Sequence, residues 1–152
     1  NPVRRGLAAF PASAFWDALA GEPPGSRTIA VAPFQYSSYE WAGPLWELRS
    51  RQRVVPAYLW GACVAKRYGE VPPGAGFRFA NAVHLADPWA SAHRHVDFLA
   101  YYKGPRWDNV SPPMPHCEAW ARERFGTPFH EDAALVVWKR PVGLTNPARQ
   151  PE

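Results

Sequence analysis

The sequence predicts a small α/β domain with three layers, in which a sheet with parallel core strands ends in an antiparallel C-terminal hairpin. Short apolar runs bounded by turn residues are typical of buried strands, and they occur at Thr28–Phe34, Arg53–Trp60, Val96–Tyr102 and Ala133–Lys139. Segments with helical patterns lie between these runs. Strands that alternate with helices favour a layered structure whose central strands are parallel.

The size of the chain fits one domain with a single hydrophobic core. It has 152 residues, of which 47% are hydrophobic and 20% are charged, as in ordinary globular proteins. The longest apolar stretch, 54–65, is interrupted by Pro56 and Gly61 and is too short to predict a membrane span. The chain opens on Asn1, so we expect it to begin inside a longer product. We assign 1–139 to the domain and 140–152 to a flexible tail.

Three helices and two weaker elements are expected between the main strands. Ser13 can cap a short helix that ends before Gly21, and Gly126 can end the last helix. Pro56 predicts that the second strand is an edge strand or has a local defect. The expected helices are 13–20, 44–51 (with Pro44 in its first turn) and 117–125, and the weaker elements are a strand at 77–83 and a helix at 88–95.

The C-terminal hairpin has the most distinctive sequence of the chain. Thr127 to His130 is expected to pair, through a turn at Glu131 and Asp132, with Ala133–Lys139. This segment, with Gly126, Pro128, the His-Glu-Asp run and the apolar strand, matches the pattern G-x-P-x-[YH]-E-D-x-x-L-x-V-[YW]-[RK]. It resembles the hairpin that closes the C-terminal domain of bacterial dolichyl-phosphate-mannose-transferase-like (GT-C) membrane glycosyltransferases.

Two further segments carry the same resemblance. Val96–Tyr102, followed by Lys103, is similar to a strand of that family, and the helix, turn-rich link and apolar strand at 13–34 are similar to the start of its domain. The resemblance implies an extracytoplasmic domain, periplasmic or at the cell surface, that is tethered to the membrane part of its parent chain. Catalysis would belong to the membrane part. This domain would contact a sugar acceptor, a lipid-linked sugar donor or a partner.

The segment after the first strand is the predicted ligand site, because ligands of α/β sheets bind beyond the carboxyl ends of the strands. Aromatic side chains there offer faces for sugar rings, and the charged ones can hold hydroxyl groups or phosphate oxygens. We also considered that these aromatics are core residues and that the charges are a solvated helix face. The predicted ligand-binding residues are Gln35, Tyr36, Tyr39, Glu40, Trp41, Arg49 and Arg51.

A second pattern, His93-Arg-His95-Val-Asp97, suggests a different function. In extended backbone its three side chains share one face, and imidazole and carboxylate groups suit zinc, as in metal-dependent hydrolases. The hydrolase pattern continues with another His, where this chain has Phe98. We therefore predict no metal and no cofactor, and keep a small hydrolase as the alternative, beside a freestanding carbohydrate-binding or interaction domain.

Charge and cysteine content limit the remaining classes. The net charge of +4 allows anionic partners, but the charges are scattered apart from Arg49, Arg51 and Arg53, and no reader motif accompanies them, so nucleic acid is not expected. Cys63 and Cys117 lack the C-x-x-C spacing of zinc ribbons. The sequence leaves open whether they are buried thiols or, as the extracytoplasmic context suggests, a disulfide.

Overall fold

The computed structural model describes residues 13–32, 36–58, 83–90, 95–103 and 115–144, and at 36–42, 58 and 115 it describes the backbone alone. The elements in these ranges are α2 (Ala14–Ala20), β1 (Thr28–Ala32), α3 (Tyr36–Ser50), β2 (Arg53–Tyr58), β3 (Val83–His84), the 3-10 helix η3 (Pro88–Ala90), β4 (Phe98–Tyr102), α4 (Pro115–Phe125), β5 (His130–Glu131) and β6 (Leu135–Lys139).

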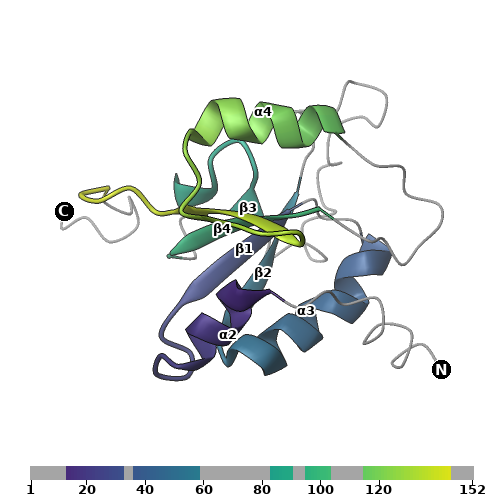
Figure 1. The fold of residues 1–152 in the computed structure, drawn as a ribbon, viewed down its shortest axis with the longest axis vertical. Helices are drawn as coiled ribbons and strands as arrows, with labels where there is room; N and C mark the ends of the chain where they lie inside the picture. Colours follow the sequence, from purple (N-terminus) through teal and green to yellow (C-terminus); the bar gives the residue numbers. More distant parts are fainter. Residues whose placement is uncertain (1–12, 33–35, 59–82, 91–94, 104–114, 145–152) are drawn as a thin grey trace, which may run out of the picture.

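Six strands within the described ranges form one mixed sheet in the order β3-β2-β1-β4-β6-β5. Neighbouring strands from β3 to β4 pair in parallel, and β6 pairs antiparallel with both β4 and β5. The predicted fold class is therefore confirmed: the core is parallel and the chain ends in an antiparallel hairpin (Figure 1).

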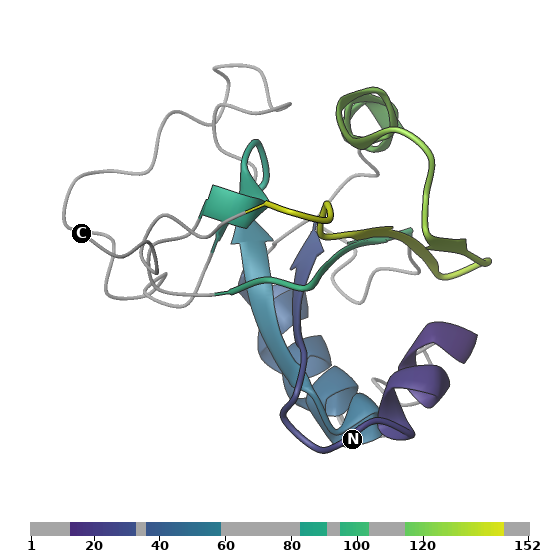
Figure 2. The same ribbon diagram turned by 90° about the vertical axis from the view of Figure 1, so that its left-hand side faces the viewer.

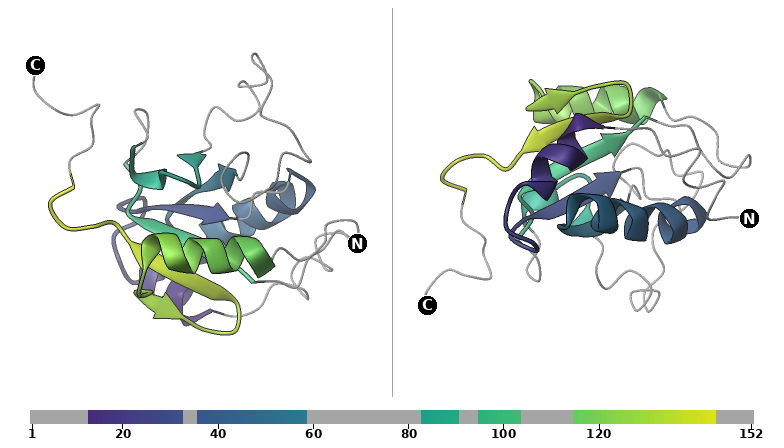
Figure 3. Two further views of the ribbon diagram at one scale, coloured as in Figure 1. Left: turned by 90° about the horizontal axis from the view of Figure 1, so that it is seen from above. Right: turned by 60° about the horizontal axis from the view of Figure 1, so that its bottom comes forward.

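Helices cover both faces of the sheet, so the structure has three layers: α2 and α3, the sheet, and α4 (Figures 1 and 3). Successive strand residues point to opposite faces, so each central strand contributes to two cores. One core packs the sheet against α2 and α3 and includes Phe15, Trp16, Ile29, Trp46, Phe98 and Val137. The other packs it against α4 and η3 and includes Ala30, Trp89, Leu99, Cys117, Ala121 and Trp138.

Helix α3 differs from the prediction, which placed a loop at Gln35–Trp41 and began the helix at Pro44. The helix already begins at Tyr36, so Pro44 lies inside it. An internal proline removes one helical hydrogen bond and normally ends a helix. Here tertiary packing compensates, because Trp46 is buried and stacks on Trp16 at a centroid distance of 5.8 Å.

Strand β2 is not at the edge of the sheet, since it lies between β1 and β3. The prediction for Pro56 is wrong in that respect, but the pairing explains how the proline is tolerated. Pro56 is in register with Val31 of β1, whereas β3 pairs only with Ala57 and Tyr58 within the described residues. Pro56 thus precedes the stretch that is paired on the β3 side.

The final hairpin forms with a shifted turn. Strand β5 is limited to His130 and Glu131, and the turn follows at 132–134. The reason is the carboxylate of Asp132, whose Oδ1 accepts hydrogen bonds from the backbone N–H groups of Ala134 (2.8 Å) and Leu135 (3.0 Å). A turn closed by its own Asp side chain is a common alternative to continued strand pairing.

Further expectations concerned the ends of two helices, the cysteines and the C-terminal segment. Ser13 caps α2 as predicted, and Gly126 ends α4 with a φ of 77°, the left-handed conformation that favours glycine. Cys117 is buried and disulfide-bonded, and the chain's other cysteine, Cys63, lies outside the described residues. Arg140, in the expected tail, is fixed, since its guanidinium donates to the carbonyl groups of Trp89, Val96 and Leu144.

Candidate functional site at the carboxyl edge of the sheet

The carboxyl ends of β1 and β4 mark the candidate site. From β1 the chain crosses through α3 to β2 on one side, and after β3 it returns to β4 on the other side of β1. Two neighbouring parallel strands whose connections leave in opposite directions form a topological switch point, the usual place for a ligand in an open α/β sheet. We call this end of the sheet the carboxyl edge, and the opposite end the amino edge.

The structure separates the predicted ligand-binding residues into two groups. The backbone places Tyr36, Tyr39, Glu40 and Trp41 in the first turns of α3, next to the carboxyl edge, and Gln35 lies outside the described residues. Arg49 is in the last turn of the same helix. The length of an α-helix puts roughly 20 Å between Tyr36 and Arg49. One compact site therefore does not include both groups.

The two arginines at the end of α3 have their own surroundings at the amino edge. The guanidinium of Arg49 donates to both carboxylate oxygens of Asp17 in α2, at 3.1 and 3.3 Å. Arg51 is exposed, has a φ of 59°, and its carbonyl accepts a hydrogen bond from the N–H of Gly25. These contacts connect α3 to α2 and to the turn before β1.

Tyr102 and Lys103, at the end of β4, flank the switch point on its other side. Tyr102 is half-buried against Trp46, with ring centroids 5.4 Å apart in an edge-on arrangement. The backbone N–H of Lys103 donates to the carbonyl of Ala134, and its Nζ lies 3.4 Å from Oε1 of Glu131. Lys103 is thus a positive charge held at the end of a core strand.

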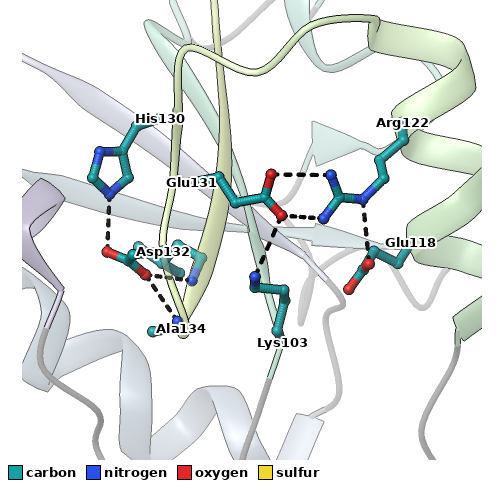
Figure 4. A network of polar contacts seen from close by, with 8 residues as sticks. Lys103, Glu118, Arg122, His130, Glu131, Asp132 and Ala134 are labelled. Carbon is teal, nitrogen blue, oxygen red and sulfur yellow. Dashed lines mark hydrogen bonds and ion pairs between the residues drawn. The ribbon is translucent and has the colours of Figure 1, made fainter.

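A chain of ion pairs continues from Lys103 to α4 (Figure 4). Glu131 accepts hydrogen bonds from both Lys103 and Arg122, and Arg122 also donates to Glu118 one helical turn away. Hydrogen bonding by Arg122 lowers the pKa of Glu131 to about 2, against the opposing effect of burial and with support from Lys103. Each of these four charged side chains has a partner of opposite charge. The ion pairs therefore join the hairpin to α4 and leave no free acid or base among them.

Asp132 is the centre of a second cluster, which contains Ser13 and His130. Figure 4 shows the contacts of Asp132 with His130 and with the turn. Its Oδ2 accepts a hydrogen bond from Ser13 Oγ at 2.7 Å and lies 2.9 Å from His130 Nε2. Burial opposes ionisation of this carboxyl, but hydrogen bonds from His130, Ser13 and two backbone N–H groups prevail and hold its pKa well below the usual range.

The arrangement of Ser13, Asp132 and His130 differs from a catalytic triad. In a triad the histidine lies between the nucleophile and the acid and removes the proton of the hydroxyl group. Here the carboxylate lies between the other two groups, and Ser13 is 1% exposed and caps α2. The cluster ties the start of α2 to the turn of the hairpin.

The His-x-His-x-Asp pattern lies at the amino edge, where Asp97 has a structural role. Its Oδ2 accepts a hydrogen bond from the N–H of Thr28 at 2.8 Å, and its Oδ1 lies 3.3 Å from Nε2 of His95. His93 lies outside the described residues. Within the ranges that the structure describes, no group of three His, Cys, Asp or Glu side chains is arranged to hold a metal ion.

Sequence reasoning missed Lys103 and the role of Asp132. Lys103 directly follows the predicted strand Val96–Tyr102, so the rule that selected the segment after β1 would also have selected it. The only sequence signal for the role of Asp132 was its position in the predicted turn. Its partner Ser13 is 119 positions away in the chain, and no local pattern predicts that contact.

Comparison with known proteins adds no relative: no family model, no curated protein and no solved structure matches this chain. None of the helices in the described ranges has the length and hydropathy needed to cross a bilayer.

Proposed function

We propose that this chain is the extracytoplasmic accessory domain of a membrane-embedded glycosyltransferase-like protein, and that it contacts a sugar ligand at the carboxyl edge of the sheet. The ligand would be the sugar acceptor or the lipid-linked donor, and the transfer itself would take place in the membrane part of the parent protein. The observation that carries the ligand site is the switch point between β1 and β4.

The roles of the hairpin residues support an accessory function. The polar residues of the motif that resembles the GT-C family hold the hairpin in place: Asp132 closes its turn, His130 binds Asp132, and Glu131 binds α4 through Arg122. The motif's apolar residues at 135, 137 and 138 are buried. A motif whose His, Glu and Asp residues fix the hairpin and whose apolar residues are packed is a signature of a fold, and it leaves chemistry to another part of the protein.

The state of the described nucleophiles supports the same conclusion. Ser13 donates to Asp132, Ser50 donates to the carbonyl of Trp46, and the sulfur of Cys117 is in a disulfide. None of these three groups is a free nucleophile next to a base, which covalent catalysis requires. The disulfide also favours an oxidising compartment, in agreement with an extracytoplasmic domain.

The proposed site combines the start of α3 with the end of β4. The backbone places the aromatic residues Tyr36, Tyr39 and Trp41 in the first turns of α3 at this edge, and Lys103, whose ammonium group is paired with Glu131, lies at the end of the neighbouring strand. The N-terminal end of α3 adds positive electrostatic potential. These groups suit a sugar that carries a phosphate.

Ligand titrations test the proposal and its location together. The 152-residue chain is titrated with a soluble sugar phosphate and with a short-chain polyprenyl phosphate sugar, and binding is followed by calorimetry. We expect Tyr36→Ala and Trp41→Ala each to weaken binding by about tenfold or more, as truncation of a central aromatic does, with no loss of thermal stability. Arg49→Ala, at the other end of α3, is the matched control and should leave the Kd unchanged.

Two results would contradict this proposal. The first is that neither probe binds the wild-type chain. The second is that Arg49→Ala weakens binding while the two aromatic variants do not, which would move the ligand to the amino edge. If Trp41→Ala unfolds the domain, Tyr36→Ala and Tyr39→Ala still decide the question. The wild-type chain should transfer no sugar between the probes and an acceptor.

A further inference from the structure

The described residues include large exposed apolar side chains in segments next to the amino edge of the sheet. Four large ones stand out: Leu48 is 77% exposed, Phe129 57%, Val142 100% and Leu144 44%. Leu48 lies in the last turn of α3, Phe129 directly precedes β5, and the other two follow the end of β6. All these segments meet the sheet at its amino edge, which Figure 2 shows from the front.

Exposed cations lie in segments at the same edge. Arg51 and Arg53 are exposed, and within the described residues neither side chain takes part in an ion pair. Lys139 is also exposed, and its Nζ lies 5.6 Å from the ring centroid of Phe129. Arg53 and Lys139 belong to β2 and β6, three strands apart in the sheet order, so the spacing of strands places them roughly 15 Å from each other.

Three acidic side chains at the amino edge have partners within the fold. Glu22 pairs with Arg27 at 3.2 Å, Asp97 accepts from the N–H of Thr28, and Glu47 accepts from the N–H of Val54 at 3.0 Å. Their contacts hold turns and strand ends in place. These three carboxylates are therefore used within the fold, whereas Arg51 and Arg53 have no ion-pair partner among the described residues.

The amino edge is also a rigid surface. Gln52, which is 3% exposed, accepts a hydrogen bond from the N–H of Arg27 and donates to the carbonyl groups of Leu19 and Pro23. The N–H of Arg140 donates to the carbonyl of Asp97 across β6 and β4. The turns that carry the cations and the apolar groups are thus fixed before any partner arrives, so little ordering is required on binding.

We propose that the amino edge docks on an anionic membrane surface. Basic residues attract acidic lipid headgroups, and apolar side chains beside them enter the boundary between headgroups and acyl chains, which is the combination found here. Exposed apolar side chains mark protein or membrane interaction sites, and the cations on the same edge favour an anionic membrane as the partner. Arg51, Arg53 and Lys139 supply the attraction, and Leu48, Phe129 and Val142 supply the apolar contact.

This inference goes beyond the proposed function, since it requires no sugar ligand. It does give the proposed site a direction: with the amino edge on the bilayer, the carboxyl edge faces water. That second step rests on the proposed function, and it favours the water-soluble acceptor over the lipid-linked donor as the ligand.

Vesicle flotation tests the membrane surface without any sugar present. The full 152-residue chain is mixed with phosphatidylcholine vesicles that contain or lack phosphatidylglycerol, and the bound fraction is measured at low and high salt. We expect binding to the anionic vesicles alone, and weaker binding at high salt. The double variant Arg51→Gln/Arg53→Gln should bind about 25-fold more weakly, because each cation near an anionic surface adds about fivefold.

Two further variants separate charge from apolar contact. Arg51→Lys/Arg53→Lys keeps both charges and is the matched control, so it should bind within about twofold of the wild type. Leu48→Gln/Val142→Gln changes two exposed side chains and should weaken binding at least about fivefold, since apolar burial is lost. Thermal unfolding of every variant shows that the fold is intact.

Three outcomes would overturn the inference. Equal binding to vesicles with and without phosphatidylglycerol would remove the role of charge. Unchanged binding by the Arg51→Gln/Arg53→Gln variant would place the contact elsewhere. Tighter binding to duplex DNA than to the anionic vesicles would make the amino edge a nucleic-acid surface. None of these results bears on sugar binding at the carboxyl edge, so the two proposals fail independently.

Discussion

The amino and carboxyl edges of the sheet are connected and stabilised in different ways. At the amino edge the turns 21–27 and 51–52 are short, and buried polar groups such as Gln52 and Ser50 bind their backbone. At the carboxyl edge the segments after β2 and β4, 59–82 and 104–114, lie outside the described residues, and the side-chain contacts of the hairpin are ion pairs near the surface. Within the described residues, one end of the sheet is therefore held by buried polar groups and the other by ion pairs near the surface.

This difference indicates a division of roles. A rigid edge that presents fixed cations and apolar groups suits a broad, featureless partner such as a membrane surface. Long connections at the carboxyl ends of parallel strands are where α/β proteins place their ligand-binding residues, because the scaffold tolerates variation there. The three predictions that follow test whether the two edges depend on different interactions, from the largest expected effect to the smallest.

The carboxyl edge should depend on the disulfide. Cys117 is the third residue of α4, which follows the long connection after β4. Replacing it in Cys117→Ser opens a loop of about 50 residues, which should lower the free energy of unfolding by about 4 kcal/mol. Urea denaturation of the variant, and of the wild-type chain with and without reductant, measures the effect. Equal stability of all three samples would show that the cross-link contributes nothing.

The amino edge should depend on Gln52. Its amide makes three hydrogen bonds to backbone groups of α2 and of the turn before β1, at 2.9, 3.0 and 3.2 Å. Gln52→Ala leaves these groups without partners in a buried place, which should cost about 2–3 kcal/mol in denaturant titrations. The neighbouring exposed change Arg53→Gln is the control and should stay within about 0.5 kcal/mol. If both variants lose the same stability, the polar network does not support this edge.

The hairpin should lose stability in acid through Asp132. Its pKa is lower in the folded protein than in the unfolded chain, so ionised Asp132 stabilises the fold above the unfolded value of about 4. This contribution is lost as the pH falls below that value toward the lower folded pKa. Asp132→Asn should therefore lose on the order of 2 kcal/mol at neutral pH and much less in strong acid.

Glu131 provides the comparison for that experiment. The stability that ionised Glu131 contributes is lost as the pH falls from its usual pKa to its folded pKa of about 2. Its side chain is 39% exposed, so solvent screens its ion pair, and Glu131→Gln should change the acid dependence less than Asp132→Asn. Denaturation at several pH values measures both. An Asp132→Asn protein with the same pH dependence as the wild type would show that other carboxyl groups govern acid unfolding.

Much of the fold could be predicted from local patterns. Apolar runs located β1, β2, β4 and β6, because a strand that is buried on both faces consists of apolar residues. The glycine at 126 marked the end of α4, because the left-handed backbone there favours glycine. Local patterns failed at α3. Pro44 suggested a helix start, whereas the helix extends back to Tyr36 and is held to α2 by the buried Trp46.

The sequence by itself determined which segments are buried strands, where the last hairpin lies, and which residue types are available for a ligand. The tertiary structure alone decided how they are combined. Strand order put β1 between β2 and β4 and so created the switch point. The length of α3 separated Arg49 from Tyr36, and the fold joined Asp132 to Ser13. The physical reason is that strand identity depends on nearby residues, whereas these contacts depend on the packing of segments that are far apart in the chain.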